Sequence, residues 1–186
     1  LRSGARVGDL VVVTGTLGEA AIGMEILKKG NYKLGEALMQ SLARFRRPEP
    51  RLKASRAILE MQPSSMIDVS DGLLSDLWHL LEASGVGARL DAEKIPVGEG
   101  VLEYCSGNRQ EALSVALSGG EDYELLFTLR PHLADKVAEI EKKAEIRLTV
   151  IGEITQKEKG VKLATSSGET ALQCEGFDHF RTKHNP

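Results

Sequence analysis

The chain has 186 residues, a length that suits one domain of ordinary to large size with a hydrophobic core. Hydrophobic residues make up 41% of the chain and charged residues 27%, proportions that are typical of a soluble globular protein. The net charge of −3, the aromatic content of 4% and a longest aliphatic run of only residues 10–13 argue against nucleic-acid and membrane partners. The two cysteines fit neither a disulfide framework nor a metal site, so a reducing, cytoplasmic compartment is expected.

The first part of the chain predicts one strand followed by three helices. Residues 9–15 are rich in β-branched side chains and end in a glycine, which indicates a buried strand. A helix over 16–29 ends in two lysines followed by a glycine, as helices often do. Regularly spaced leucines predict a second helix over 34–46, and two prolines separate it from a third helix over 51–61.

Basic side chains gather around the connection between the second and third predicted helices. They are Arg44, Arg46, Arg47, Arg51 and Lys53. We favour a solvated helix–turn–helix surface as the interpretation of this cluster, because charged runs on helices usually face water. Contact with an anionic ligand is the alternative interpretation.

The central stretch predicts a buried strand over 65–69 that turns sharply into a helix over 73–84. Asp68 and Ser70 lie two residues apart, so on a strand they face the same side, and Asp71 stands where the helix begins. Carboxylates beside a helix N-terminus suit a metal ion and a phosphate group. On the local pattern alone, helix capping is the simpler interpretation, because Asp and Ser are ordinary capping residues.

The helix over 73–84 carries an apolar stripe that is expected to face the core. Its members are Leu74, Leu77, Trp78 and Leu81. The spacing of this stripe predicts that Trp78 is a core residue.

The second half of the chain alternates strands and helices. The predicted strands are 88–91, 123–129 and 148–154, the predicted helices are a short one within 96–107, one over 108–115 and one over 131–143, and a hairpin joins 161–165 to 169–173. The order strand–helix–strand therefore occurs twice, at 65–91 and at 123–152. This order predicts an α+β domain with a mixed sheet and a partial ferredoxin-like split β-α-β arrangement.

Five motifs in register resemble those of the thiamine-monophosphate kinase family, within the superfamily of aminoimidazole ribonucleotide synthetase. The motifs are Arg2-Ser3-Gly4-Ala5 with Gly8-Asp9, Asp68-Val69-Ser70-Asp71-Gly72-Leu73, Ser118-Gly119-Gly120-Glu121-Asp122-Tyr123-Glu124-Leu125, Ile151-Gly152-Glu153-Ile154 and Gly176-Phe177-Asp178-His179-Phe180. Only the C-terminal part of the family is matched. The resemblance implies that 1–8 are an interdomain connection, 9–181 the C-terminal α+β domain and 182–186 a tail.

The resemblance implies a kinase that transfers the γ-phosphoryl group of ATP to thiamine monophosphate, with Mg²⁺ as cofactor. It implies that Asp68 and Asp71 are Mg²⁺ ligands and that Ser70 and Arg2 contact ATP. No residue is assigned as a general acid or base, because the acceptor is already a phosphate oxyanion and the reaction needs charge neutralisation and in-line placement.

The thiamine substrate is expected to contact Glu121 and Phe177, again by resemblance. A carboxylate at Glu121 suits a cationic thiazolium or an amino donor, and the Phe177 ring suits stacking. The residue types alone favour bland roles instead: a turn carboxylate for Glu121 and a hydrophobic plug for Phe177.

The family's N-terminal half, with its Gly-Asp-Asp loops, has no counterpart in this chain. We therefore expect the chain alone to be inactive, and we expect the full-length protein to be a homodimer. The alternatives are another ATP-dependent enzyme of the superfamily, of the selenophosphate synthetase or hydrogenase-maturation type, and a non-catalytic binding module. A diguanylate cyclase is disfavoured, because the similarity is confined to residues 119–123.

Overall fold

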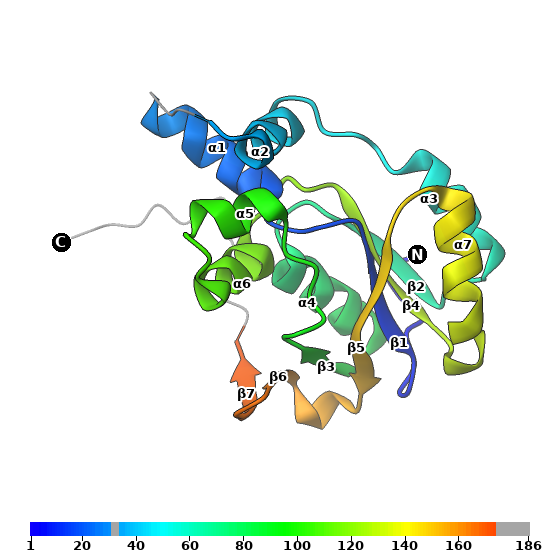
Figure 1. Ribbon diagram of the computed structural model, residues 1–186. Helices are drawn as coiled ribbons and strands as arrows, with labels where there is room; N and C mark the ends of the chain where they lie inside the picture. Colours follow the sequence, from blue (N-terminus) through cyan, green and yellow to red (C-terminus); the bar gives the residue numbers. More distant parts are fainter. Residues whose placement is uncertain (31–33, 174–186) are drawn as a thin grey trace.

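The computed structural model describes residues 1–30 and 34–173, which build one mixed sheet with helices on both faces (Figure 1). Its seven strands lie in the order β2-β4-β1-β5-β3-β6-β7. Neighbouring strands pair antiparallel, except that β3 and β6 are parallel. The strands are β1 (Leu10–Thr14), β2 (Ser65–Val69), β3 (Gly87–Asp91), β4 (Glu124–Leu129), β5 (Leu148–Thr155), β6 (Val161–Thr165) and β7 (Gly168–Leu172).

The helices agree with the predicted ones, apart from small shifts at their ends. They are α1 (Glu19–Lys29), α2 (Glu36–Arg46), α3 (Leu52–Glu60), α4 (Leu73–Ser84), α5 (Glu99–Tyr104), α6 (Arg109–Ser118) and α7 (Val137–Ala144), with short 3-10 helices η1 (Pro131–Lys136) and η2 (Lys157–Lys159). The helix predicted over 131–143 begins as the 3-10 helix η1, which has its proline in the first turn. Each helix within 1–30 and 34–173 is too short or too polar to reach across a lipid bilayer.

Strand β1 is apolar from Leu10 to Val13 because both faces of the sheet are covered. Val11 and Val13 pack into the cluster that contains α4, whereas Val12 packs into the cluster that contains α3 and α7. Figure 1 shows α3 and α7 on one side of the strands and α4 on the other. A third cluster joins α1, α2, α5 and α6 beside the sheet.

The predicted split β-α-β arrangement is present in the second half of the sheet. Strands β4 and β5 both pair antiparallel with β1, which lies between them, and α7 connects them. In the other predicted strand–helix–strand unit, over 65–91, three strands separate β2 from β3 in the sheet. The resemblance to a ferredoxin-like sheet is therefore partial, as expected.

Four strand ends meet at one end of the sheet. The pairing of Val69 with Glu124 and of Thr14 with Leu148 places the ends of β2 and β1 beside the beginnings of β4 and β5. Residues that are far apart in the chain therefore share one end of the molecule, and the predicted site residues that follow β2 belong to it.

The prediction that Trp78 is a core residue is wrong. Its side chain is 37% exposed, whereas Leu73, Leu77 and Leu80 are fully buried against the sheet. The buried stripe of α4 is centred on Leu77 and rotated toward Leu73 and Leu80, so Trp78 lies at the edge of the helix–sheet contact. The leucine spacing alone is compatible with a buried stripe centred on Leu77 and also with one turned toward Trp78.

Replacing Leu77 by Ala should lower the free energy of unfolding by about 3 kcal/mol, because it leaves a cavity in a close-packed core. Trp78→Ala, one residue along the same helix, should lower the free energy of unfolding by less than Leu77→Ala does, since part of the Trp78 surface already contacts water. Denaturant unfolding of both variants measures the difference. A loss for Trp78→Ala equal to or above that of Leu77→Ala would contradict the observed orientation of α4.

Candidate functional site

The junction between β2 and α4 presents the side chains of two predicted ligands to solvent. Along β2, Ile67 and Val69 are buried while Asp68 between them is exposed. Asp71 is also exposed, and Ser70 is half-buried. The carboxylates of Asp68 and Asp71 make no hydrogen bond or ion pair with any other residue in the described part of the chain.

A different residue, Asp76, holds the junction in shape. Its buried carboxylate lies in the first turn of α4, and its Oδ2 accepts the N–H groups of Ser70 and Asp71, each at 2.9 Å. Burial raises the pKa of Asp76, and the two N–H donors oppose that shift; the nearby charges of Asp71 and Asp68 raise the pKa further. The backbone of the turn is therefore fixed by a residue that was not predicted.

The capping interpretation favoured by the local pattern is wrong for Asp71. The residue that precedes α4 is Gly72, and no side chain caps the first N–H groups of this helix. Gly72 has φ of 112°, a value that glycine adopts readily and side-chain-bearing residues rarely do. Because Asp76 bonds the turn from inside the helix, the side chains of Asp71 and Ser70 remain available for a ligand.

The loop that enters β4 lies directly against this junction. Glu121 donates its N–H to the carbonyl of Ser70 and Tyr123 donates to the carbonyl of Val69, both at 2.8 Å. A Cβ on Gly120 would lie 2.6 Å from the Ser70 carbonyl oxygen, so only glycine fits there. Glu121 has a positive φ of 70°, and its Oε2 accepts the Tyr123 hydroxyl at 3.1 Å. These contacts fix the Glu121 carboxylate beside the β2–α4 junction.

A cavity of about 320 Å³ brings three of the predicted residues together. Ser70, Asp71 and Glu121 line one part of it. The apolar part is lined by Ala20, Ala21, Met24 and Phe45, which come from α1 and α2. The site thus combines carboxylates with an apolar wall, a combination that suits an organic cation or an aromatic ring.

The other predicted residues stand apart from this cavity. Asp68 precedes the junction by two positions and does not line the cavity. Arg2 lies near the opposite end of β2, where the carbonyl of Leu1 accepts the Met66 N–H and the Arg2 carbonyl accepts the Ser84 hydroxyl at 3.4 Å. Phe177 lies outside the described residues.

The donor set fits part of a magnesium site. Oxygen ligands suit Mg²⁺, which binds proteins through one or two carboxylates and completes its shell with water and phosphate oxygens. Asp68 and Asp71 supply two such carboxylates. Within 1–30 and 34–173, no group of three or more His, Cys, Asp or Glu side chains could hold a metal by itself. Any metal held here would need further ligands from a phosphate group or another protein segment.

Asp122, which the sequence analysis did not single out, ties the neighbouring helix to the same loop. Its buried carboxylate accepts the N–H of Gly18 at 2.6 Å and the N–H of Ala20 at 3.1 Å, across more than a hundred residues of chain. It therefore caps the N-terminus of α1. Burial raises the pKa of Asp122 to about 7, against the opposing effect of the two N–H donors, and the charge of Glu124 adds to the rise.

Glu124 explains part of the basic cluster. Its fully buried carboxylate accepts the Thr14 hydroxyl at 2.6 Å, two N–H groups of Arg51 at 2.9 and 2.7 Å, and one of Arg44 at 3.2 Å. The interpretation of the cluster as a merely solvated surface is therefore wrong for Arg44 and Arg51. Glu124 lies 80 positions from Arg44 and 73 positions from Arg51 in the sequence, so the local pattern carried no signal of this pairing.

Comparison with known proteins identifies the class to which this fold and site belong. The family described as "AIR synthase related protein, C-terminal domain" matches residues 6–163, and the chain belongs to that family. The match confirms the predicted α+β fold of the synthetase-like type.

Within this class, the chain is similar to thiamine-monophosphate kinases. It is 38% identical over 181 residues to the enzyme of Buchnera aphidicola (subspecies Acyrthosiphon pisum) and 37% identical over 186 residues to that of Escherichia coli K12. Each alignment covers 97% of this chain and 55% of the relative. The predicted resemblance is confirmed, and the chain spans about half the length of the curated relatives it matches.

Solved structures agree with these relatives. The thiamine-monophosphate kinase of Stenotrophomonas maltophilia superposes with a TM-score of 0.78 at 33% identity, covering 87% of this chain and 52% of the other. The structure described as AaThiL complexed with AMPPCP and TMP superposes with a TM-score of 0.78 at 31% identity, covering 96% of this chain and 53% of the other. The hydrogenase maturation protein HypE of Escherichia coli has a TM-score of 0.69 at 18% identity, a likeness of fold alone.

The raised pKa of Asp122 predicts a stability that declines with pH. Between an unfolded pKa near 3.8 and a folded pKa of about 7, the folded chain keeps a proton that the unfolded chain has lost. The contribution of Asp122 to stability is therefore complete below this window and is lost as the pH rises through it, by at most about 1.4 kcal/mol per pH unit. Asp122→Asn removes this titration.

Urea unfolding of the wild type and Asp122→Asn between about pH 5 and about pH 8 measures the effect. The stability of the wild type relative to the variant should fall across the series. Asp135→Asn, at an exposed position on η1, is the control and should show no such trend. A wild-type advantage over Asp122→Asn that stays constant across the series would refute the raised pKa.

Proposed function

We propose that this chain is the C-terminal half of a kinase that transfers the γ-phosphoryl group of ATP to thiamine monophosphate, giving thiamine diphosphate and ADP. The observation that carries the proposal is the pair of unpartnered carboxylates, Asp68 and Asp71, at a rigid junction beside the cavity that contains Glu121. The similarity to thiamine-monophosphate kinases over 97% of the chain supports it.

Asp68 and Asp71 would hold Mg²⁺, which supplies charge neutralisation when two phosphate groups approach each other. The Ser70 hydroxyl lies between them in the sequence and would donate to a phosphate oxygen of ATP. No side chain caps the first N–H groups of α4, and such groups favour negative charge nearby. The Arg2 guanidinium would reach ATP from outside the cavity, and this assignment rests on the motif alone.

The cavity next to the junction fits the organic part of thiamine monophosphate. Glu121 offers a fixed carboxylate to the thiazolium cation or to the amino group of the pyrimidine. Met24 and Phe45 offer apolar contact to an aromatic ring. Phe177 would stack on the same ligand, as its motif implies. Since the acceptor oxygen is already ionised, orientation and water exclusion are the work left to these residues.

The proposal includes a second half-site that this chain does not carry. Two carboxylates hold only part of the coordination shell that a nucleotide–metal complex needs. The remaining ligands would come from an N-terminal domain, with 1–8 as the connection to the domain over 9–181. We also propose that the full-length kinase is a cytoplasmic homodimer.

The chain alone should form no measurable thiamine diphosphate from ATP, thiamine monophosphate and Mg²⁺. Chromatographic detection of product, with a full-length relative such as the Escherichia coli enzyme as the positive control, measures this. Sustained turnover by the 186 residues would show that the site is complete without an N-terminal half.

Asp71→Asn, in a full-length kinase that contains this half, should lower kcat by about a hundredfold or more, because the variant loses a metal ligand and a charge in the reaction centre. The thermal midpoint should barely change, since the Asp71 side chain has no partner within the described residues. Asp135→Asn is the matched control and should leave kcat unchanged. Unchanged turnover of Asp71→Asn at saturating Mg²⁺ would rule out the metal-ligand role.

A further inference from the structure

A second concave site lies at the same end of the sheet, on the face covered by α3 and α7. It is a cleft of about 490 Å³ between the end of β1, the connection from α2 to α3, and the turn from α7 into β5, a size typical of small-molecule sites. Its charged lining residues are Arg44, Arg51, Lys53, Arg147, Glu49 and Glu145. The cleft shares no lining residue with the cavity that contains Ser70 and Asp71.

Arg44 adds positive charge beyond what the buried Glu124 needs. Arg51 grips the buried Glu124 with two N–H groups, so that carboxylate is already paired with one full positive charge. Arg44 adds only a single contact to Glu124, at 3.2 Å, and its side chain is 40% exposed. The guanidinium of Arg44 therefore keeps most of its N–H donors for another acceptor.

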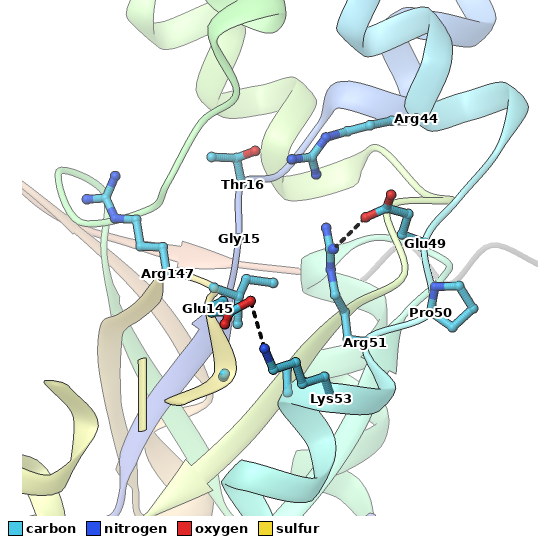
Figure 2. A pocket seen from close by; sticks show the side chains of 12 residues that line it. Gly15, Thr16, Arg44, Glu49, Pro50, Arg51, Lys53, Glu145 and Arg147 are labelled. Atoms are coloured by element: carbon cyan, nitrogen blue, oxygen red, sulfur yellow. Dashed lines mark ion pairs between the residues drawn. The ribbon is translucent and has the colours of Figure 1, made fainter. Parts of the chain in front are cut away.

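Arg147 is a further cation of the cleft, and its exposed side chain has no partner within the described part of the chain. Its carbonyl accepts the Gly15 N–H at 2.8 Å, which fixes its backbone beside the end of β1. Figure 2 shows Arg147 on one side of Gly15 and Thr16, with Arg44 and Arg51 on the other side. The side chains of Arg44 and Arg51 reach toward the cleft, whereas that of the exposed Arg147 starts at the opposite rim and extends away from them.

The two acidic residues of the cleft are outnumbered by its four cations. Glu49 is 83% exposed on its side chain and lies 3.5 Å from Arg51. Glu145 pairs with Lys53 at 2.7 Å (Figure 2), and both side chains are largely exposed. Because these carboxylates and the chain's net charge of −3 would repel a polyanion, a small anion suits the cleft better than a nucleic acid.

We propose that this cleft binds a small phosphate-bearing anion, with Arg147 and Arg44 as its main contacts. A tetrahedral phosphate group offers acceptor oxygens in several directions and can therefore accept from Arg44 in the cleft and from the exposed Arg147 side chain turned inward from the opposite rim. A carboxylate offers two oxygens in one plane. This ligand chemistry covers inorganic phosphate, pyrophosphate and phosphate esters. The site is distinct from the metal-assisted site at Asp68 and Asp71 and needs no metal ion.

The test is a titration of the ¹⁵N-labelled chain with pyrophosphate in the presence of EDTA, followed by amide chemical shifts. Saturable shifts should appear at Gly15, Thr16 and Arg147. Inorganic phosphate should shift the same amides with weaker affinity, and adenosine, which has no phosphate, should shift none of them. Arg147→Gln should weaken pyrophosphate binding by about tenfold, the value of one charge-assisted hydrogen-bonding group.

Two controls separate this site from the alternatives. Arg56→Gln removes an exposed cation of α3 that lies outside the cleft, and it should leave the affinity unchanged. Asp71→Asn should also leave it unchanged, because the cleft works without the metal-assisted site. Arg147 has no side-chain partner, so its variant should keep the thermal midpoint of the wild type.

Three results would overturn the proposal. One is a failure of the shifts to saturate, and another is a response confined to 70–72 with none at Gly15 or Thr16. The third is an equal loss of affinity in Arg147→Gln and Arg56→Gln, which would show attraction to general positive charge and no built site.

Discussion

The hydrogen bonds from the Asp76 carboxylate to the Ser70 and Asp71 N–H groups are the interactions on which the candidate site depends. They satisfy backbone donors that a ligand-binding side chain would otherwise have to satisfy. Asp122 does the same for α1 by accepting two N–H groups from a distant segment. In both cases burial raises the pKa of the carboxyl group, so each helix start is held at an electrostatic cost. Unfavourable local terms of this kind are expected where a site must be rigid.

Side chains of opposite charge occupy different places at one end of the sheet. On the α4 side, Asp71 and Glu121 flank a cavity that suits a cation. On the α3–α7 face, Arg44 and Arg147 line a cleft that suits an anion. Two charged surfaces thus lie a few strands apart without neutralising each other, because the sheet and its buried residues stand between them.

The fold was largely predictable because its elements carry strong local patterns. Strand β2 and helix α4 have the predicted bounds, since an apolar run and a spaced leucine stripe depend on neighbours within a few residues. The orientation of α4 was not predictable to the same degree, and Trp78 was wrongly assigned to the core. The centre of a buried stripe is set by the strands that it meets, and that contact is absent from the local sequence.

In the candidate site, too, the residues that depend on local sequence were predictable and those that depend on distant contacts were not. Asp68, Ser70 and Asp71 were predicted from adjacent residues, whereas the support from Asp122 and the pairing of Glu124 with Arg51 join segments that only the sheet brings together. The motif resemblance predicted Glu121 as a site residue. Its backbone is held by the hydrogen bond from its N–H to the Ser70 carbonyl, a contact that the sequence did not predict.

The buried position of Glu124 shows how the two faces of this sheet end depend on each other. Removing Arg51, which holds Glu124 with two N–H groups, would leave a buried carboxylate with too little compensation, which is costly in a low-dielectric interior. Glu124 also lies two residues after Asp122 and raises its pKa, so the cations over the cleft and the cap of α1 belong to one electrostatic network. Charges that bind an anion on one face therefore also stabilise the loop that positions Glu121 on the other. Arg44 and Arg51 consequently have a structural role that is independent of any ligand. The Arg147 side chain has no partner within the described residues, so only the proposed ligand role applies to it.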